Sequence, residues 1–185
     1  GAAQPEPGAT HYFGRIGRHE LKLESHTEVV TYSAFSPGLS DRPFDPAAFA
    51  VFPADWLAEA PGLRLTSALI RVELMPEAPE ELTRRLGEYF VAESLTASQV
   101  IDGQAVVATD FRIDPAGHVR FVVFVRPGTG PRRIGRIVQR LCEVELYKTL
   151  SMLGLARVRA LSGPMGEIDT RLSALVSDLT GGGGA

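Results

Sequence analysis

Cysteine is nearly absent from this 185-residue sequence, and its single residue, Cys142, excludes an internal disulfide. Because Cys142 lies in a run with the apolar spacing of a helix, we expect a buried, unreactive thiol. The four histidines are scattered along the chain, without the ligand spacing of a zinc site. No cofactor-binding motif occurs, so the sequence predicts no cofactor.

Long hydrophobic runs are absent as well. The longest apolar stretch, residues 121–125, has the length of a strand, whereas a membrane-spanning helix needs about 20 residues. The first ten residues lack the basic start and apolar centre of a signal peptide. A net charge of −3 offers no basis for nucleic-acid binding, and we expect no nucleic-acid partner.

The sequence does have the composition of a globular domain, with 44% hydrophobic and 22% charged residues. Residue patterns predict strands over 19–35, 63–74, 97–101, 104–113 and 118–126. We therefore expect an α+β fold: a mixed or antiparallel sheet of about five strands covered by helices, with a C-terminal helical extension. The expected organisation is a flexible lead-in over 1–10, the α+β domain over 11–160, and a helix with a Gly-rich tail over 161–185, leading to further segments.

Three helices are predicted. Proline and acidic residues open the first, over 79–91, and the second spans 131–154 and stops at Gly154. The third, over 164–180, carries apolar residues at alternating spacings of three and four, as in a coiled coil. It either docks on its own domain or joins copies into a homo-oligomer. The residues of this stripe are Met165, Ile168, Leu172, Leu175 and Leu179.

Glu24, His26 and Glu28 share one face of the predicted strand 19–35. Carboxylates flanking an imidazole suit a divalent metal or a proton relay. Alternate side chains of a strand lie about 7 Å apart, which is too far for one ion without a bend. A solvated or salt-bridged sheet face is the favoured interpretation, and these three residues stay weak candidates for a metal whose presence the sequence leaves unknown.

Asp110 and Arg112 lie inside the predicted strand 104–113. Charges in the middle of a strand need partners, so we predict that Arg112 forms a salt bridge with Glu24, Glu28 or another acid of the sheet. A structural polar network is the first interpretation and a ligand site the second.

A third group of polar residues surrounds the start of the predicted helix 131–154. Gly128 and Gly130 precede it, without the remaining residues of a phosphate-binding loop. A solvated basic face is favoured over an anion site or a partner contact. The residues concerned are Arg132, Arg133, Arg136, Arg140 and Glu143.

Four ordered segments resemble the bacterial domain-of-unknown-function family 3422. Residues 21–29 read Leu-Lys-Leu-Glu-Ser-His-Thr-Glu-Val, where the family has Trp third and Phe last. Residues 53–57 read Pro-Ala-Asp-Trp-Leu, residues 109–112 read Thr-Asp-Phe-Arg, and residues 135–148 run from Gly-Arg-Ile-Val-Gln-Arg to Tyr-Lys. The resemblance implies the soluble N-terminal part of a longer protein, attached to the cytoplasmic face of the bacterial inner membrane by hydrophobic helices absent here. It implies no particular reaction.

The leading functional hypothesis is a non-enzymatic domain of a membrane-anchored bacterial protein, acting in assembly or ligand sensing. An alternative is a regulatory domain of a metal-ion-transport-like membrane protein, because the implied layout is similar to that of CorA-type magnesium channels. A third is an enzyme with a polar site around His26, Asp110 and Arg112. No catalytic motif supports this last reading.

Overall fold

The computed structural model describes residues 6–60 and 62–181. Residues 1–5 of the predicted lead-in and 182–185 of the predicted Gly-rich tail lie outside the described residues. The chain divides into two compact units. The first contains Gly1–Leu63 and Leu69–Thr129, and the second contains Arg64–Ala68 and Gly130–Ala185.

The first unit begins with a three-stranded antiparallel sheet of β1 (His11–Ile16), β2 (His19–Ser25) and β3 (Val30–Phe35), in that order. We expected a single strand over 19–35, and this was wrong. The chain reverses over residues 26–29, where the amide of His26 donates to the carbonyl of Val29 at 2.8 Å. This turn contains no glycine, proline or asparagine, so the sequence carries no turn signal there.

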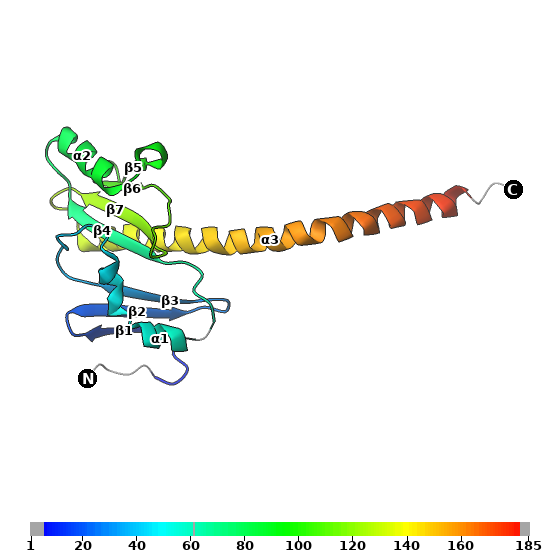
Figure 1. Ribbon diagram of the computed structural model, residues 1–185, viewed down its shortest axis with the longest axis horizontal. Helices are drawn as coiled ribbons and strands as arrows, with labels where there is room; N and C mark the ends of the chain where they lie inside the picture. Colours follow the sequence, from blue (N-terminus) through cyan, green and yellow to red (C-terminus); the bar gives the residue numbers. More distant parts are fainter. Residues whose placement is uncertain (1–5, 61, 182–185) are drawn as a thin grey trace. The chain divides into compact units, whose positions relative to one another are not determined.

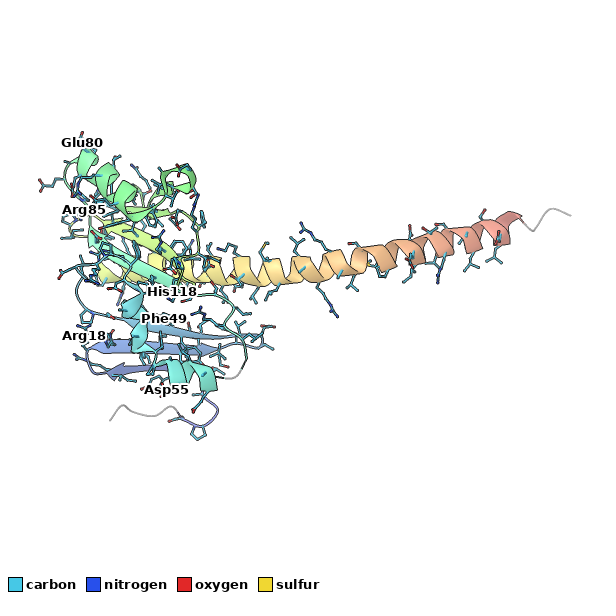
Figure 2. The ribbon with its side chains drawn as sticks, viewed as in Figure 1. Arg18, Phe49, Asp55, Glu80, Arg85 and His118 are labelled. Carbon is cyan, nitrogen blue, oxygen red and sulfur yellow. The ribbon has the colours of Figure 1, made fainter. Side chains whose placement is uncertain are left out.

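Two short helical segments follow, η1 (Pro46–Val51) and α1 (Ala54–Glu59), the second at the predicted helical turn. Their aromatic side chains pack on both sheets of the unit. The Trp56 ring meets that of Tyr32 edge-on, with centroids 5.0 Å apart. The rings of Phe49 and His118 lie 4.6 Å apart and are labelled in Figure 2. The long connection is thereby held against the core, as its aromatic residues predict.

A second sheet has the strand order β4-β7-β6-β5, with β4 (Ala68–Leu74), β5 (Thr96–Val100), β6 (Ala105–Thr109) and β7 (Val119–Val125). Strands β5, β6 and β7 are antiparallel neighbours. The turn between β5 and β6 contains the predicted Asp102-Gly103 pair, and Gly103 adopts the positive φ of 79° that glycine tolerates. The predicted α+β class, with antiparallel strands and a C-terminal helical extension, is confirmed.

Helix α2 (Pro79–Tyr89) lies over this second sheet (Figure 1). Pro79 fits the first helical position, and Glu80 and Glu81 favour the positive end of the helix dipole. A short η2 (Ala92–Ser94) follows the helix. Apolar side chains from α2, β6 and β7 form the core of this face: Leu86, Tyr89, Phe90, Val106, Ala108, Val122 and Phe124.

The second unit is dominated by one helix, α3 (Pro131–Gly181). We expected two helices, and the expected stop at Gly154 was wrong: Gly154, Gly163 and Pro164 all lie within α3. A glycine costs a helix only about 1 kcal/mol, and a proline about 3 kcal/mol, which a long helix tolerates. Cys142 is also exposed, contrary to the expected burial.

The two halves of α3 differ in exposure. In the first, Glu145 is buried and accepts hydrogen bonds from Thr66 (2.8 Å) and Lys148 (2.5 Å). The first of these ties the segment Arg64–Ala68 to the helix. In the second half every described side chain from 151 to 179 is exposed.

Candidate functional site

A single arginine interrupts the buried strand β7. Arg120 points to the same face as Val122 and Phe124, the face that α2 covers. Its Nη2 donates to Oδ2 of Asp110 at 3.0 Å, and the Asp110 side chain is 0% exposed. Because a buried carboxylate needs a partner, removing Arg120 alone is expected to destabilise the sheet.

A bulge at the end of β6 brings Asp110 to Arg120. Ala108 pairs with Val122 and Ile113 pairs with Val119, so residues 109–112 stand opposite only residues 120–121. Within the bulge Phe111 has a φ of 53°, a left-handed conformation that is unusual for a large side chain. Bulges re-aim side chains in this way and often border functional sites.

The carboxylate of Asp110 also fixes two backbone amides. Its Oδ2 accepts from the amide of Val91, two residues after the end of α2, and its Oδ1 accepts from the amide of Arg112, both at 3.2 Å. With Arg120, this gives the carboxylate three donors. Asp110 therefore joins the end of α2, the bulge and β7 in one hydrogen-bonded group.

Beside this pair lies a cavity of about 240 Å³, lined by Pro43, Phe44, Glu88, Tyr89 and Arg120. The guanidinium carbon of Arg120 lies 6.0 Å from the ring centroid of Phe44 and 5.8 Å from that of Phe90. This is cation–π distance. The Nε of Arg120 is buried and has no hydrogen-bond partner within the described part of the chain.

A second buried carboxylate adjoins the cavity wall. The Glu73 side chain, on β4, is 2% exposed and accepts from Arg71, from Arg85 at 2.7 Å and from the Tyr89 hydroxyl at 2.8 Å. Burial alone would raise the pKa of Glu73, but the hydrogen bonds from Arg71, Tyr89 and Arg85 outweigh it and lower the pKa. Burial, and then the bond to Glu73, raise the pKa of Tyr89.

Glu88 forms the rim of the cavity, and its side chain is 52% exposed. Its carboxylate contacts Arg84, which also donates to Glu81 at 2.8 Å. Hydrogen bonds from Arg84 and Arg85 lower the pKa of Glu81 to about 2. The rim therefore presents paired charges, and Arg85, labelled in Figure 2, connects Glu81 of α2 with Glu73 of β4.

Of the polar residues singled out in the sequence, Asp110 lies in this site and Arg112 does not. Nε of Arg112 donates to Oγ of Ser94 at 2.8 Å, and among the described residues Arg112 forms no salt bridge. The predicted ion pair of Arg112 is wrong. The bulge breaks the strand alternation that would have kept Arg112 on the same face as Asp110, and Arg120 takes its place.

Glu24, His26 and Glu28 do not share a strand face. Glu24 lies on β2 and pairs with Lys22 at 2.8 Å, whereas His26 and Glu28 are exposed in the turn that follows. None of the three lines the cavity beside Arg120. In the described ranges, no three His, Cys, Asp or Glu side chains are grouped so that they could hold a metal ion.

The basic residues of α3 are exposed on its first turns. Arg132, Arg133, Arg136 and Arg140 make no salt bridge with any residue that the structure describes. Glu143 accepts a hydrogen bond from Gln139 at 2.9 Å. Their role in binding an anion or a partner stays a prediction.

Arg120 and Glu73 were not selected from the sequence, although a signal for both is present. Arg120 stands inside the apolar run 119–125, and Glu73 inside the largely apolar run 68–74. A charge within such a run must be paired if the strand is buried. That signal marks the residue but does not identify its partner.

Comparison with known proteins shows the family. The model of the family described as protein of unknown function, DUF3422, matches residues 1–184, and the chain belongs to this family. No curated protein and no solved structure shows significant similarity to the chain. Among the described helices, none combines the length and apolarity required to cross a bilayer.

Proposed function

We propose that this chain is an assembly module that pairs with a second copy of itself through the exposed half of α3. The observation that supports this is an uncovered apolar repeat on a continuous helix. We call it the seam: Val158, Leu161, Met165, Ile168, Leu172, Leu175 and Leu179, each exposed and separated by three and four residues in turn. This is the heptad spacing that pairs helices side by side.

The continuity of α3 strengthens this interpretation. A helix that began at residue 164 would carry only the five positions from Met165 onward. Because α3 continues through Gly163 and Pro164, Val158 and Leu161 extend the same repeat. An exposed apolar surface of this length is typical of an interface.

An antiparallel arrangement of two copies suits the residues beside the seam. It places Val158 opposite Leu175, Leu161 opposite Leu172 and Met165 opposite Ile168 of the second copy. The same alignment brings Arg157 next to Asp178, twice by symmetry. In a parallel, in-register pair Arg157 faces Ser162 and gains no ionic partner. Flanking charges of this kind select the orientation of a coiled coil.

Sedimentation of the chain over a range of concentrations tests the pairing. We expect a monomer–dimer equilibrium, and we expect Leu172→Glu to abolish the dimer, because a charge would be buried in the seam. Ser173→Glu, which adds the same charge one residue away on the polar side, is the matched control and should leave the dimer intact. A wild-type chain that stays monomeric throughout, or a dimer that tolerates Leu172→Glu, overturns the proposal.

The orientation is tested by disulfide trapping in a Cys142→Ser background, which removes the exposed native thiol. Cysteines placed at Val158 and Leu175 in separate chains should cross-link with each other when mixed. Neither should cross-link with itself. Self-cross-linking of each single variant would instead show a parallel pair.

We also propose, on the family resemblance, that the longer protein is attached to the inner membrane on its cytoplasmic side by segments beyond this chain. An antiparallel pair of α3 helices lying along the membrane surface would let both chains reach the same bilayer. Fractionation of cells expressing the longer protein tests the attachment. Recovery of that protein in the soluble fraction would contradict it.

A further inference from the structure

We infer that the cavity beside Arg120 binds a small zwitterion of the α-amino acid class, with its carboxylate on Arg120 and its ammonium group on Glu88. The two charges line one cavity, together with Phe44, Tyr89 and Pro43. This inference rests on the first unit alone and is independent of pairing through α3.

Arg120 provides the anion-binding end. Its guanidinium group carries five N–H donors, and within the described part of the chain Nη2 alone donates to protein, to Asp110. The side chain is 23% exposed and lines the cavity, and because its Nε is buried we assign the ligand carboxylate to the Nη groups. Asp110 and the rings of Phe44 and Phe90 hold it in place. A fixed guanidinium with remaining donors is well suited to a carboxylate.

Glu88 provides the opposite end and narrows the ligand class. Arg84 bonds Oε1 of Glu88, so we place the ligand's ammonium group on Oε2, where a negatively charged ligand group would be disfavoured. The aromatic ring of Phe44, which already lies at cation–π distance from Arg120, adds a favourable surface for an apolar side chain. One positive and one negative group at the same cavity match a molecule that carries both charges.

The volume sets the size of the ligand. About 240 Å³ is smaller than the roughly 300–1,000 Å³ of pockets that hold drug-sized molecules. A nucleotide or a peptide is too large for it, whereas a single amino acid is of suitable size. Beside its two charged residues the lining offers Pro43, Phe44 and Tyr89, which suit a small aliphatic side chain.

Calorimetric titration tests the ligand class, with glycine, L-alanine, L-valine and L-leucine as probes. We expect at least one of them to bind. Its N-acetyl form lacks the ammonium group and its amide form lacks the carboxylate, and each should bind at least about tenfold more weakly. Absence of binding for all four amino acids, or equal binding of either modified form, overturns the inference.

Two variants locate the site. Glu88→Gln removes the charge at the rim and should weaken binding about tenfold. Glu80→Gln, an exposed acid on the same helix and labelled in Figure 2, is the matched control and should not change it. Arg120→Lys keeps a positive charge near Asp110 but loses the planar fork, so affinity should fall while thermal unfolding stays cooperative. Unchanged affinity in Glu88→Gln would exclude this cavity.

Discussion

The face between α2 and its sheet and the exposed half of α3 solve opposite problems. The first buries charge: Asp110 and Glu73 are withdrawn from water, and each has partners within the same unit. The second exposes apolar surface: every seam residue is accessible to solvent. In the first region the chain supplies partners for its own buried charges. In the second it leaves apolar side chains exposed, and we propose that another molecule covers them.

This difference predicts two kinds of stability. Buried ion pairs within one chain contribute to folding at any protein concentration and depend on pH. An apolar interface between chains depends on concentration and only weakly on pH. The effect of variants in the first region should therefore depend on pH, and the effect of variants in the second should depend on protein concentration.

The largest expected effect is that of Arg120→Ala. It leaves the Asp110 carboxylate buried without its cation, so the free energy of unfolding should fall by about 3–5 kcal/mol. Urea denaturation measures it, at any chain concentration. Arg112→Ala is the matched control, because among the described residues this exposed side chain bonds only Ser94, and its effect should stay within about 0.5 kcal/mol. Equal effects of the two variants would contradict the assignment of Arg120.

Pro164→Ala should strengthen the second region. Alanine is favoured over proline inside a helix by about 3 kcal/mol, and proline 164 lies within α3. We expect more helix by circular dichroism and tighter association by sedimentation, with the gain in association visible only where dimers form. Ser173→Ala, a milder change on the polar side, serves as control. Weaker association of Pro164→Ala would show that the proline shapes the interface.

Acid should act on the first region through Glu73. Its pKa is lowered in the folded protein, so its contribution is present above the ordinary value of about 4.3 and is lost as the pH falls through the folded pKa. Glu73→Gln should therefore lose less stability than wild type when denaturation is repeated at falling pH. Repeating the comparison in the Leu172→Glu background, where no dimer is expected, should give the same difference. If the free energy of unfolding falls with pH equally in Glu73→Gln and wild type, the assigned role of Glu73 is contradicted.

The smallest effect is expected for Lys22→Ala. Its ion pair with Glu24 is partly exposed on β2, and such pairs contribute about 0–1 kcal/mol. Raising the salt concentration should remove what difference there is between the variant and wild type. If Lys22→Ala lowered the free energy of unfolding as much as Arg120→Ala, the ion pair with Glu24 would be part of a structural or ligand site and not a surface pair.

The sequence predicts well where several local signals agree. Helix α2 begins at Pro79, with acids in its first turn, and the Asp102-Gly103 pair lies at the β5–β6 turn. These are local preferences, and tertiary contacts act in the same direction. The strands 97–101 and 118–126 are close to β5 and β7 for the same reason, whereas the predicted strand 104–113 is too long, because β6 ends at Thr109.

The sequence predicts the wrong local structure where a turn signal is absent or where neighbouring residues outweigh a helix-breaking one. The turn at 26–29 has no typical turn residue, so one strand was expected where the chain forms a hairpin. In α3 the breaking residues are outweighed by good helix formers on both sides, including Leu155, Ala156 and Leu161. Because the predicted helix starts at residue 164, it omits Val158 and Leu161, the first two residues of the seam.

The candidate site depends on register, which a pattern of residue types does not encode. Asp110 was recognised as a charge that needs a partner, but the regular alternation of a strand assigns Arg112 to its face. The extra residues of the bulge change that face, and the partner arises from β7, ten residues further along the chain. The partner of Asp110 can therefore be identified only from the register of β6 and β7.

The bulge has a consequence for the motion of β6. Phe111 holds a left-handed conformation that costs on the order of 1–3 kcal/mol, and a regular ladder would release this cost. The ion pair of Asp110 with Arg120 opposes that relaxation. Hydrogen–deuterium exchange of the amides of residues 109–113 therefore reports a balance between backbone strain and charge, and a ligand that drew Arg120 away from Asp110 would shift this balance and speed the exchange.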